Sequence, residues 1–252
     1  MQWNNIKEQL ISFLKTEVDK AGLQRVTVGL SGGLDSAIVA ILCKEAFGKN
    51  MSCVLMPSHY SSEGSVKHAL EVCEKFDIDY EIVEIAPMVE AHEKFMNNDK
   101  LRIGNFSARM RMSVLYDVSA RDSSLVVGTS NKSEILLGYG TIFGDVACAI
   151  NPIGEMYKSD EFEFGKFLGV PDSILEKRPS ADLWEGQSDE DELGYSYKQM
   201  DSVLKKLVDE GISKEELVSN GVDEKLIDML VYRMKANAFK GKLPTIAKIK
   251  WS

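Results

Sequence analysis

The stretch RVTVGLSGGLDSAIVAILCKEAF, residues 25–47, decides the fold. It begins with a short β-branched run, RVTVGL (25–30), and passes through a loop with two adjacent glycines. It continues as LDSAIVAILCKEAF (34–47), an apolar segment of helical character. A strand, a tight loop and a helix in this order put the loop at the carboxyl end of a strand, where open parallel sheets bind their ligands.

The same alternation of strand and helix continues toward the carboxyl end. We expect further strands at MSCVLMP (51–57), YEIVEIA (80–86) and SSLVVGTS (123–130). We expect helices over about 4–20, over about 62–76 with Ser61 or Ser62 as the cap, and over about 101–120, and Pro87 suits the start of a further helix. Strands that alternate with helices are typical of a parallel sheet with crossover helices on both faces. The fold class is therefore predicted to be α/β, a doubly wound parallel sheet.

The sequence beyond about residue 188 changes character, because strand patterns stop and only helical patterns remain. We expect helices near 190–209, 213–220 and 223–239. The run SDEDELG (188–194) is interpreted as a helix start, since a serine followed by acidic residues is favoured there. The prediction is one domain, residues 1–252, with an α/β core over about 1–187 and a helical part over about 188–252.

Composition limits the classes of function. The chain has 252 residues, 44% of them hydrophobic, and its 39 acidic and 30 basic residues give a net charge of −9. An acidic surface repels the phosphate backbone of nucleic acids, so no nucleic-acid partner is expected. The longest apolar runs, such as AIVAIL (37–42), are far too short to span a bilayer, and the first residues carry no secretion signal. We therefore expect no membrane partner and a cytoplasmic location.

The loop after the first strand has the properties of a phosphate-binding site with one contradiction. Gly32 and Gly33 let a phosphate approach the backbone amides, and Ser31 and Ser36 supply hydroxyl groups. A Walker A loop has a lysine here, whereas this loop carries Asp35, whose charge repels a bare phosphate. A bridging Mg²⁺ resolves the conflict. The alternative is an ordinary turn in which Ser31 or Asp35 only caps the helix.

Four stretches resemble a known family. SGGLDS (31–36) is similar to the S-G-G-x-D-S pyrophosphate loop of the ATP pyrophosphatase superfamily, whose members cleave ATP between the α and β phosphates. Three further stretches resemble the ammonia-dependent NAD synthetases: GNFSARMRM (104–112), GTSNKSEILLGYGTIFGD (128–145), and NPIGEMYKSD (151–160) running on to PSADL (179–183). The resemblance implies a Rossmann-like ATP pyrophosphatase fold and an AMP-forming ligase. It would amidate deamido-NAD with ammonia through an adenylated intermediate.

The resemblance also implies roles in ATP and metal binding. The implied ATP-binding residues are Gly29, Leu30, Ser31, Gly32, Gly33, Leu34, Asp35, Ser36, Thr129, Lys158 and Ser180. Asp35 and Glu134 are expected to share Mg²⁺ at neighbouring strand ends, and Lys158 to supply the cation that the loop lacks. Glu134 has a second interpretation, an acid in the first turn of a helix behind Ser130 or Asn131.

Substrate contacts are expected from three further places. Asn105 and Arg109 lie four residues apart and share one helix face, while Arg111 should point elsewhere and is ranked lower. Asp145 is the third catalytic candidate beside Asp35 and Lys158, either orienting ammonium or holding a ribose hydroxyl. Phe239 and Lys240 come from NAFKGKLP (237–244), which departs from the family pattern at Phe239 and Gly241. Ile142 and Ala149 are further departures from that pattern.

The expected partners are deamido-NAD, ATP and ammonia, with ATP as co-substrate and Mg²⁺ as cofactor. No glutaminase domain fits beside this one in 252 residues, so free ammonia or a separate glutaminase subunit is expected to supply the nitrogen. The resemblance implies a homodimer. Two alternatives stay open: another amidating enzyme of the ATP pyrophosphatase type, and a nucleotide-binding sensor that holds ATP without turning it over.

Overall fold

The computed structural model describes residues 2–59, 63–180, 186–242 and 244–250. Its centre is a parallel sheet in the order β3-β2-β1-β4. The strands are β1 (Arg25–Gly29), β2 (Met51–Leu55), β3 (Tyr80–Ile82) and β4 (Ser124–Val127). Val28 lies beside both Cys53 and Val127, so β1 is a central strand and its carboxyl end is flanked by those of β2 and β4.

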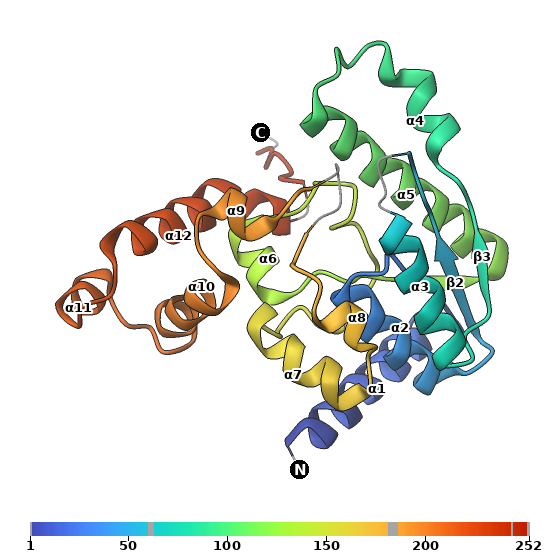
Figure 1. Cartoon of the computed structure of the whole chain (residues 1–252), viewed down its shortest axis with the longest axis horizontal. Helices are drawn as coiled ribbons and strands as arrows, with labels where there is room; N and C mark the ends of the chain where they lie inside the picture. The colour runs from blue at the N-terminus through green and yellow to red at the C-terminus, as the bar shows by residue number, and fades with distance from the viewer. Residues whose placement is uncertain (1, 60–62, 181–185, 243, 251–252) are drawn as a thin grey trace.

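Helices cover both faces of this sheet (Figure 1). On one face lie α1 (Gln2–Lys20), α2 (Leu34–Phe47), α3 (Glu63–Lys75) and α7 (Lys158–Leu168). On the other lie α4 (Ala86–Glu93) and α5 (Lys100–Asp122), and α5 packs on β1 and β4. The two short helices of this half are α6 (Lys132–Leu137) and α8 (Asp172–Leu175). The predicted doubly wound α/β class is confirmed.

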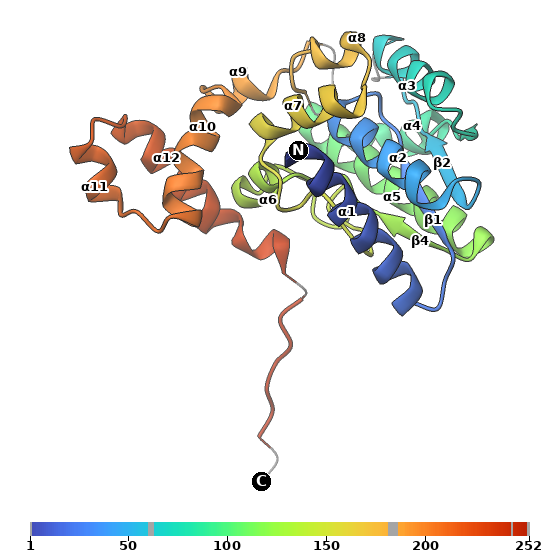
Figure 2. The same ribbon diagram turned by 90° about the horizontal axis from the view of Figure 1, so that it is seen from below.

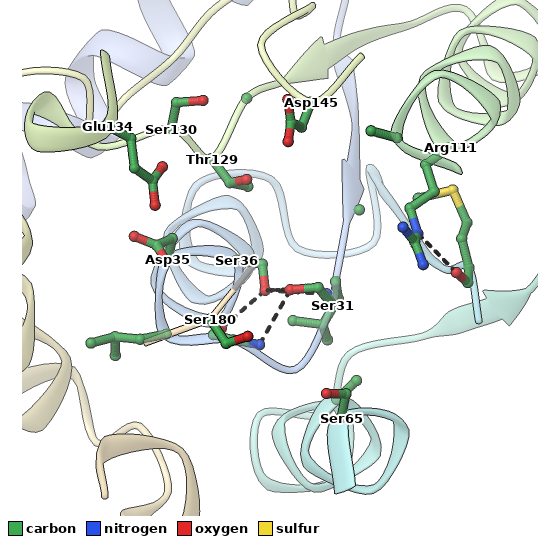
Figure 3. Close-up of a pocket in the computed structure, with 18 of the residues that line it drawn as sticks. Ser31, Asp35, Ser36, Ser65, Arg111, Thr129, Ser130, Glu134, Asp145 and Ser180 are labelled. Carbon is green, nitrogen blue, oxygen red and sulfur yellow. Dashed lines mark hydrogen bonds between the residues drawn. The ribbon is translucent and has the colours of Figure 1, made fainter. Parts of the chain in front are cut away.

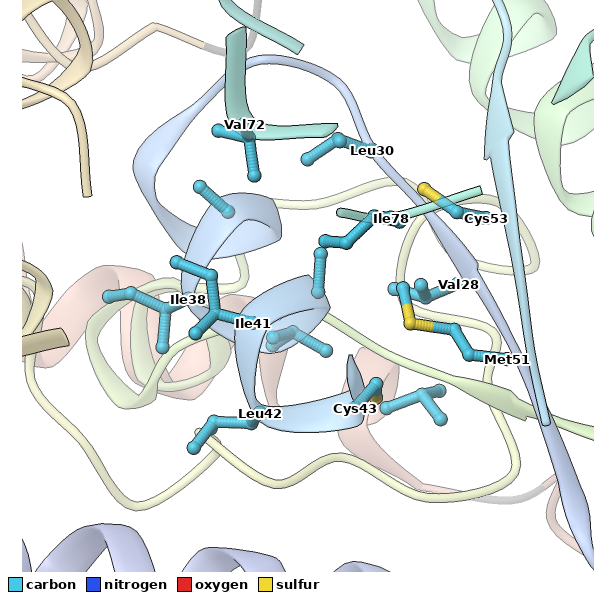
Figure 4. Packing of buried hydrophobic residues seen from close by; sticks show 14 of the residues in the cluster. Val28, Leu30, Ile38, Ile41, Leu42, Cys43, Met51, Cys53, Val72 and Ile78 are labelled. Carbon is cyan, nitrogen blue, oxygen red and sulfur yellow. The ribbon is translucent and has the colours of Figure 1, made fainter. Parts of the chain in front are cut away.

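The alternation of strand side chains produces two separate cores. Val26 and Val28 of β1 and Cys53 of β2 pack against α2 in the larger cluster (Figure 4), whereas Val54 points to the opposite face and packs with α4 and α5. Residues next to each other in a strand point to opposite faces of the sheet, and here helices cover both faces and exclude water from them. Helix α2 is buried along most of its length, which accounts for its nearly continuous apolar sequence.

The residues after about 188 form a helical part with its own apolar cluster, and Figure 2 shows it projecting from one side of the sheet. Its elements are α9 (Asp189–Leu193), α10 (Tyr197–Leu204), a π-helical turn (Lys205–Asp209), α11 (Lys214–Ser219), α12 (Glu224–Asn237) and a 3-10 turn (Ala238–Gly241). Leu137 of α6 and Tyr157 belong to this cluster as well. The division of the domain near residue 187 stays a prediction.

Most expected elements are present, and two of them differ clearly in extent. The strand expected over 80–86 ends at Ile82, and α4 begins at Ala86 with Pro87 in its first turn, as predicted. The helix expected over 190–209 is interrupted after Leu193, because Gly194 adopts a left-handed φ of 79° and ends α9. Ser61 and Ser62, the expected caps of α3, lie outside the described residues. Among the described helices, none has the length and apolarity that crossing a membrane requires.

Gly32 is the position in the loop where only glycine fits. Its φ is 82°, and a Cβ atom there would lie 2.0 Å from the carbonyl oxygen of Ser65 in the first turn of α3. The loop and α3 are therefore in direct backbone contact. Gly33, by contrast, has an extended φ of −91° and room for a Cβ 3.4 Å from the hydroxyl of Ser31.

We predict that Gly32→Ala destabilises the protein more than Gly22→Ala. Gly22 also has a positive φ, 71°, but nothing lies within 4 Å of its Cβ position, so it measures backbone strain alone. That strain costs about 1–2 kcal/mol, and the clash at Gly32 adds about 1–3 kcal/mol of overpacking. Denaturant unfolding of both variants measures the difference, and equal losses would contradict the contact with α3.

Candidate active site

A cavity of about 270 Å³ lies at the carboxyl end of the sheet, beside the loop after β1 (Figure 3). Several elements far apart in sequence contribute to its wall. Among the residues predicted to form the site, the lining includes Gly29, Leu30, Ser31, Gly33, Leu34, Asp35, Ser36, Thr129, Glu134, Asp145, Lys158 and Ser180. Gly32 is not part of the lining, because its place in the loop is against α3.

The loop is held in shape by its own serines. The hydroxyls of Ser31 and Ser36 lie 3.0 Å apart, the Ser31 hydroxyl accepts a hydrogen bond from the Gly33 amide at 3.2 Å, and Ser36 donates to the Gly33 carbonyl at 3.0 Å. Helix α2 begins after Gly33 without a side-chain cap. The interpretation of Ser31 or Asp35 as a helix cap is therefore wrong. An uncapped helix start at the cavity wall offers its amides and its positive dipole end to an anion.

Asp35, in the first turn of α2, is held by two groups from other elements. One carboxylate oxygen accepts a hydrogen bond from the Asn131 side chain at 2.8 Å, and the other forms an ion pair with Lys158 Nζ. Burial raises the pKa of Asp35, but the charge of Lys158 and these hydrogen bonds outweigh it and bring the pKa to about 2. Burial lowers the pKa of Lys158, and the surrounding carboxylates raise it well above its usual range. Both groups are therefore charged at neutral pH.

Glu134 is an acid in the first turn of α6, and it also lines the cavity. Asn131 caps α6 by accepting a hydrogen bond from the Glu134 amide at 2.9 Å, and the Glu134 carboxylate accepts from the Asn131 amide at 3.4 Å, which completes a capping box. The same carboxylate faces Asp35 across the cavity (Figure 3). Burial, and next the charge of Asp35, raise the pKa of Glu134 well above its usual range.

Glu161 is a third carboxyl group in this cluster, and the sequence reasoning missed it. It is fully buried one turn after Lys158 on α7, with an oxygen 3.5 Å from Lys158 Nζ. No hydrogen bond within the described part of the chain satisfies either of its oxygens. Burial, and next the charge of Asp35, raise the pKa of Glu161 well above its usual range. One lysine thus lies among three carboxyl groups.

The donor set at Asp35 and Glu134 fits a hard divalent cation. Two partly buried carboxyl groups face one another, and the raised pKa of Glu134 reflects in part the charge of its partner. The described residues provide no cluster of three or more His, Cys, Asp or Glu side chains for a metal. A cation here would therefore take its remaining ligands from water and from phosphate oxygens, which is how proteins usually hold Mg²⁺.

Arg109 and Arg111 of α5 are placed the opposite way from their predicted ranking. Arg111 lines the cavity, with its Nε donating to the Met56 carbonyl at 3.1 Å (Figure 3), and Arg109 does not line it. Arg109 donates to the Ile142 carbonyl at 3.3 Å, and Asn105 accepts from the Thr141 hydroxyl at 2.7 Å. Asn105 and Arg109 share a helix face as expected, but that face holds the segment that precedes Asp145.

Asp145 and Lys240 meet the same segment from two sides. Asp145 lines the cavity, and its carboxylate accepts from the Thr141 amide at 2.6 Å. Burial raises the pKa of Asp145. Lys240 donates to the carbonyls of Gly138 and Gly140 at 2.7 and 3.0 Å, so it reaches this segment from the helical part. Lys240 and the exposed Phe239 lie outside the cavity lining, and their roles in substrate binding stay predictions.

The cavity also contains polar residues that no motif had identified. Lys177 lines it and donates to the Ser65 hydroxyl at 2.8 Å, and Arg178 lies beside Lys177. Their signal was the basic pair directly before PSADL (179–183). Asp189 lines the cavity as well, accepting from the Tyr139 hydroxyl at 3.0 Å. Ser188 caps α9 as expected, so the run SDEDELG (188–194) is a helix start that also contributes to the site.

Comparison with known proteins places the chain in a family. The family model described as NAD synthase matches residues 6–244. The NH(3)-dependent NAD(+) synthetase of Wolinella succinogenes is 51% identical over 243 residues, which cover 96% of this chain and 95% of that protein. Among solved structures, the NH3-dependent NAD synthetase of Campylobacter jejuni in complex with the nitrate ion is 42% identical with a TM-score of 0.84. The alignment covers 98% of this chain and 100% of that one.

A second solved structure, an NMN synthetase from Francisella tularensis, is 31% identical with a TM-score of 0.88, and the alignment covers 99% of this chain and 100% of that one. The curated relative and both structures are matched over nearly their full length. Together with the match to the family model over residues 6–244, they show that this chain belongs to the NAD synthase family.

Proposed function

We propose that this chain catalyses the ATP-dependent amidation of deamido-NAD with ammonia, giving NAD, AMP and pyrophosphate through an adenylated intermediate. The observation that carries the proposal is the meeting of the loop 31–36 with Glu134 and Lys158 in one cavity. The motifs that resemble ammonia-dependent NAD synthetases supply these same residues. Two paired carboxyl groups and a buried lysine suit a site that turns ATP over, and simple retention of ATP does not require them.

In the first step the nicotinate carboxylate attacks the α-phosphorus of ATP, so two anions must approach each other. The chain's own contribution is positive charge and alignment. Lys158 carries its charge at the cavity wall, and the amides at the start of α2 point toward the place where the phosphates would lie. Thr129 and Ser180 line the same cavity and offer hydroxyl donors. These groups would also stabilise the departing pyrophosphate.

We propose that Asp35 and Glu134 hold Mg²⁺ together with ATP. The ion would supply Lewis-acid stabilisation of the phosphate charge that the two carboxylates could not provide. The fit of the donor set, two facing carboxyl groups with oxygen ligands only, supports this role.

In the second step ammonia attacks the activated carbonyl, and the ammonium so formed loses a proton. Asp145 is the carboxyl group that we assign to receive it, because burial raises its pKa toward the range useful for proton transfer at neutral pH. The Thr141 amide fixes one of its oxygens. The site that encloses it also keeps water from hydrolysing the adenylate.

A second candidate is formation of NMN by the same chemistry. The likeness to the Francisella tularensis NMN synthetase favours it, with the highest TM-score among the structures compared above. Sequence identity favours the dinucleotide, at 51% and 42% against 31%. The departures at Ile142, Ala149, Phe239 and Gly241 concern the pyridine nucleotide rather than ATP, so the two acids must be compared directly.

We also propose a homodimer that uses the outer face of α4 and α5. The large apolar side chains exposed here are Met88 of α4, Leu101 and Tyr116 of α5, and Phe95 in the segment between the two helices. Exposed apolar surface of this kind marks protein interfaces. Helix α5 also holds the segment before Asp145 through Asn105 and Arg109, so such a dimer would stabilise the substrate side of the cavity.

We predict that purified protein with ATP, Mg²⁺ and deamido-NAD releases equal amounts of NAD and AMP when ammonium is added, and none with glutamine alone. Nicotinic acid mononucleotide, tested in parallel, decides between the two candidates through kcat/KM. Asp35→Asn should lower kcat/KM by roughly 10²–10³ or more, the loss typical of a removed electrostatic contact. Asp160→Asn is the control, because Asp160 pairs with Lys205 outside the cavity. ATP binding without turnover of either acid would favour the sensor.

We predict that Lys158→Met weakens ATP binding and costs about 3–5 kcal/mol of stability, since it leaves buried carboxyl groups without their cation. Lys132→Met is the matched control. Lys132 is also an ion-paired lysine with a side chain only 15% exposed, but its partners Glu155 and Asp209 are 92% and 39% exposed and can be hydrated again. That variant should lose about 1 kcal/mol or less. Denaturant unfolding and calorimetric ATP titration measure both effects, and equal losses would contradict the role given to Lys158.

We predict that light scattering on a sizing column finds a particle of twice the chain mass of 28.1 kDa. Leu101→Asp on the exposed face of α5 should convert it to the monomer, because a charge would be buried in the interface. Tyr232→Asp, at an even more exposed apolar position on α12, should leave the dimer intact. A wild-type monomer, or the same effect from both variants, would overturn the proposed interface.

A further inference from the structure

Asp201 is a fully buried carboxylate of the helical part that reaches into the α/β core. It lies on α10, and one of its oxygens accepts a hydrogen bond from the Ser133 hydroxyl at 2.6 Å. Its other oxygen accepts from the Ser159 amide at 2.7 Å. The Ser133 hydroxyl in turn accepts from the Lys158 amide at 3.0 Å. One carboxylate thus binds the starts of two helices, α6 and α7.

The contacted residues are the chain neighbours of the proposed ATP-binding groups. Ser133 directly precedes Glu134, and Ser159 directly follows Lys158. Tyr157, the residue before α7, provides no side-chain cap, so Asp201 provides this helix start with a cap from another element. A negative charge at a helix N-terminus is favourable, and the fixed backbone there sets the direction in which Lys158 leaves the helix.

A packing role alone does not explain this residue. A carboxylate fully removed from water is costly, and an apolar side chain would fill the same place at lower cost. The two oxygens of Asp201 are instead each used for a short, directed hydrogen bond to a different helix. Two directed hydrogen bonds fix the orientation of the two helices relative to each other, whereas apolar contacts fix it only loosely.

We propose that Asp201 is a positioning residue: it fixes the starts of α6 and α7 relative to each other, so that Glu134 and Lys158 face the same ATP molecule. The inference rests on the proposed function, because it takes the cavity to be an ATP site. It concerns only the binding of ATP, which comes before the adenylyl group is transferred to the acid substrate. Asp201 itself touches neither the cavity nor, on this proposal, any substrate.

Asp209 provides a matched control. It belongs to the same helical part and also bonds to the start of α6 and to the residue before α7, through Lys132 Nζ at 2.8 Å and the Tyr157 hydroxyl at 3.0 Å. Its contacts join the same two parts of the protein and involve neither Ser133 nor Ser159. Asp209→Asn therefore measures the effect of loosening this junction in general.

The experiment compares Asp201→Asn, Ser133→Ala and Asp209→Asn with the wild type. Asn at position 201 keeps the volume but turns one acceptor into a donor. Ser133→Ala removes the hydroxyl that donates to Asp201 and accepts from the Lys158 amide, and it leaves the bond from the Ser159 amide to Asp201 in place. Calorimetric titration with Mg²⁺ and ATP gives Kd without turnover, steady-state kinetics give KM for ATP and for ammonium separately, and thermal unfolding reports the folded fraction.

We expect Asp201→Asn and Ser133→Ala to raise Kd and KM for ATP roughly 10–100-fold, as second-layer contacts of a metal site do, with KM for ammonium unchanged. Asp209→Asn should lower Tm and leave both ATP constants unchanged. A general loss of folded protein would lower kcat and move no KM. Unchanged ATP constants in folded Asp201→Asn, or the same shift in Asp209→Asn, overturn the proposal.

Two further outcomes are also decisive. If Asp201→Asn does not fold, Ser133→Ala decides, and an unchanged Kd for ATP in that variant overturns the proposal. If the wild type binds ATP but amidates neither acid, the proposed function fails, while the comparison of ATP affinities still tests Asp201. The two failures are therefore distinguishable.

Discussion

The buried ion pair between Asp35 and Lys158 is the contact on which the geometry of the site depends. It joins the start of α2 to the start of α7, elements separated by 123 positions in the chain. Removing both charges from water is costly, and the cost is offset only when the remaining hydrogen-bonding capacity is used. Asn131 meets part of that need by donating to Asp35 while it caps α6. One ion pair thus holds three helix starts around the end of the sheet.

This arrangement explains how a loop proposed to bind phosphate can contain an aspartate. The loop 31–36 is shaped by hydrogen bonds among its own serines and by the close approach of Gly32 to α3, so its amides do not need the phosphate to order them. Asp35 carries its negative charge against Lys158, and burial together with the charge of Asp35 raises the pKa values of Glu134 and Glu161. The negative charge of the loop aspartate is therefore paired with a lysine and is not left to face a phosphate alone.

Local sequence signals predicted the strand, loop and helix over 25–47, and the rule that ligands bind at carboxyl ends of parallel strands brought Asp35 and Thr129 together. The resemblance to the family added Glu134, Lys158 and Ser180. The sequence ranked Arg111 below Arg109, whereas Arg111 is the one that lines the cavity, and the reason is physical. The two residues lie about 200° apart around α5, and which one faces the cavity depends on how the helix is rotated on the sheet. No local pattern contains that rotation.

Asp201 and Glu161 were missed for a different reason, since an acidic residue within a helical pattern is ordinarily solvated and only tertiary contacts reveal its burial. Those contacts also bear on the helical part as a whole. Leu137 at the end of α6 and Tyr157 before α7 pack into its apolar cluster, while the starts of both helices face the cavity of the α/β core. The two helices that present Glu134 and Lys158 are therefore shared between the two parts. Any movement of α10 relative to the sheet would displace both groups together, which favours the prediction of one domain.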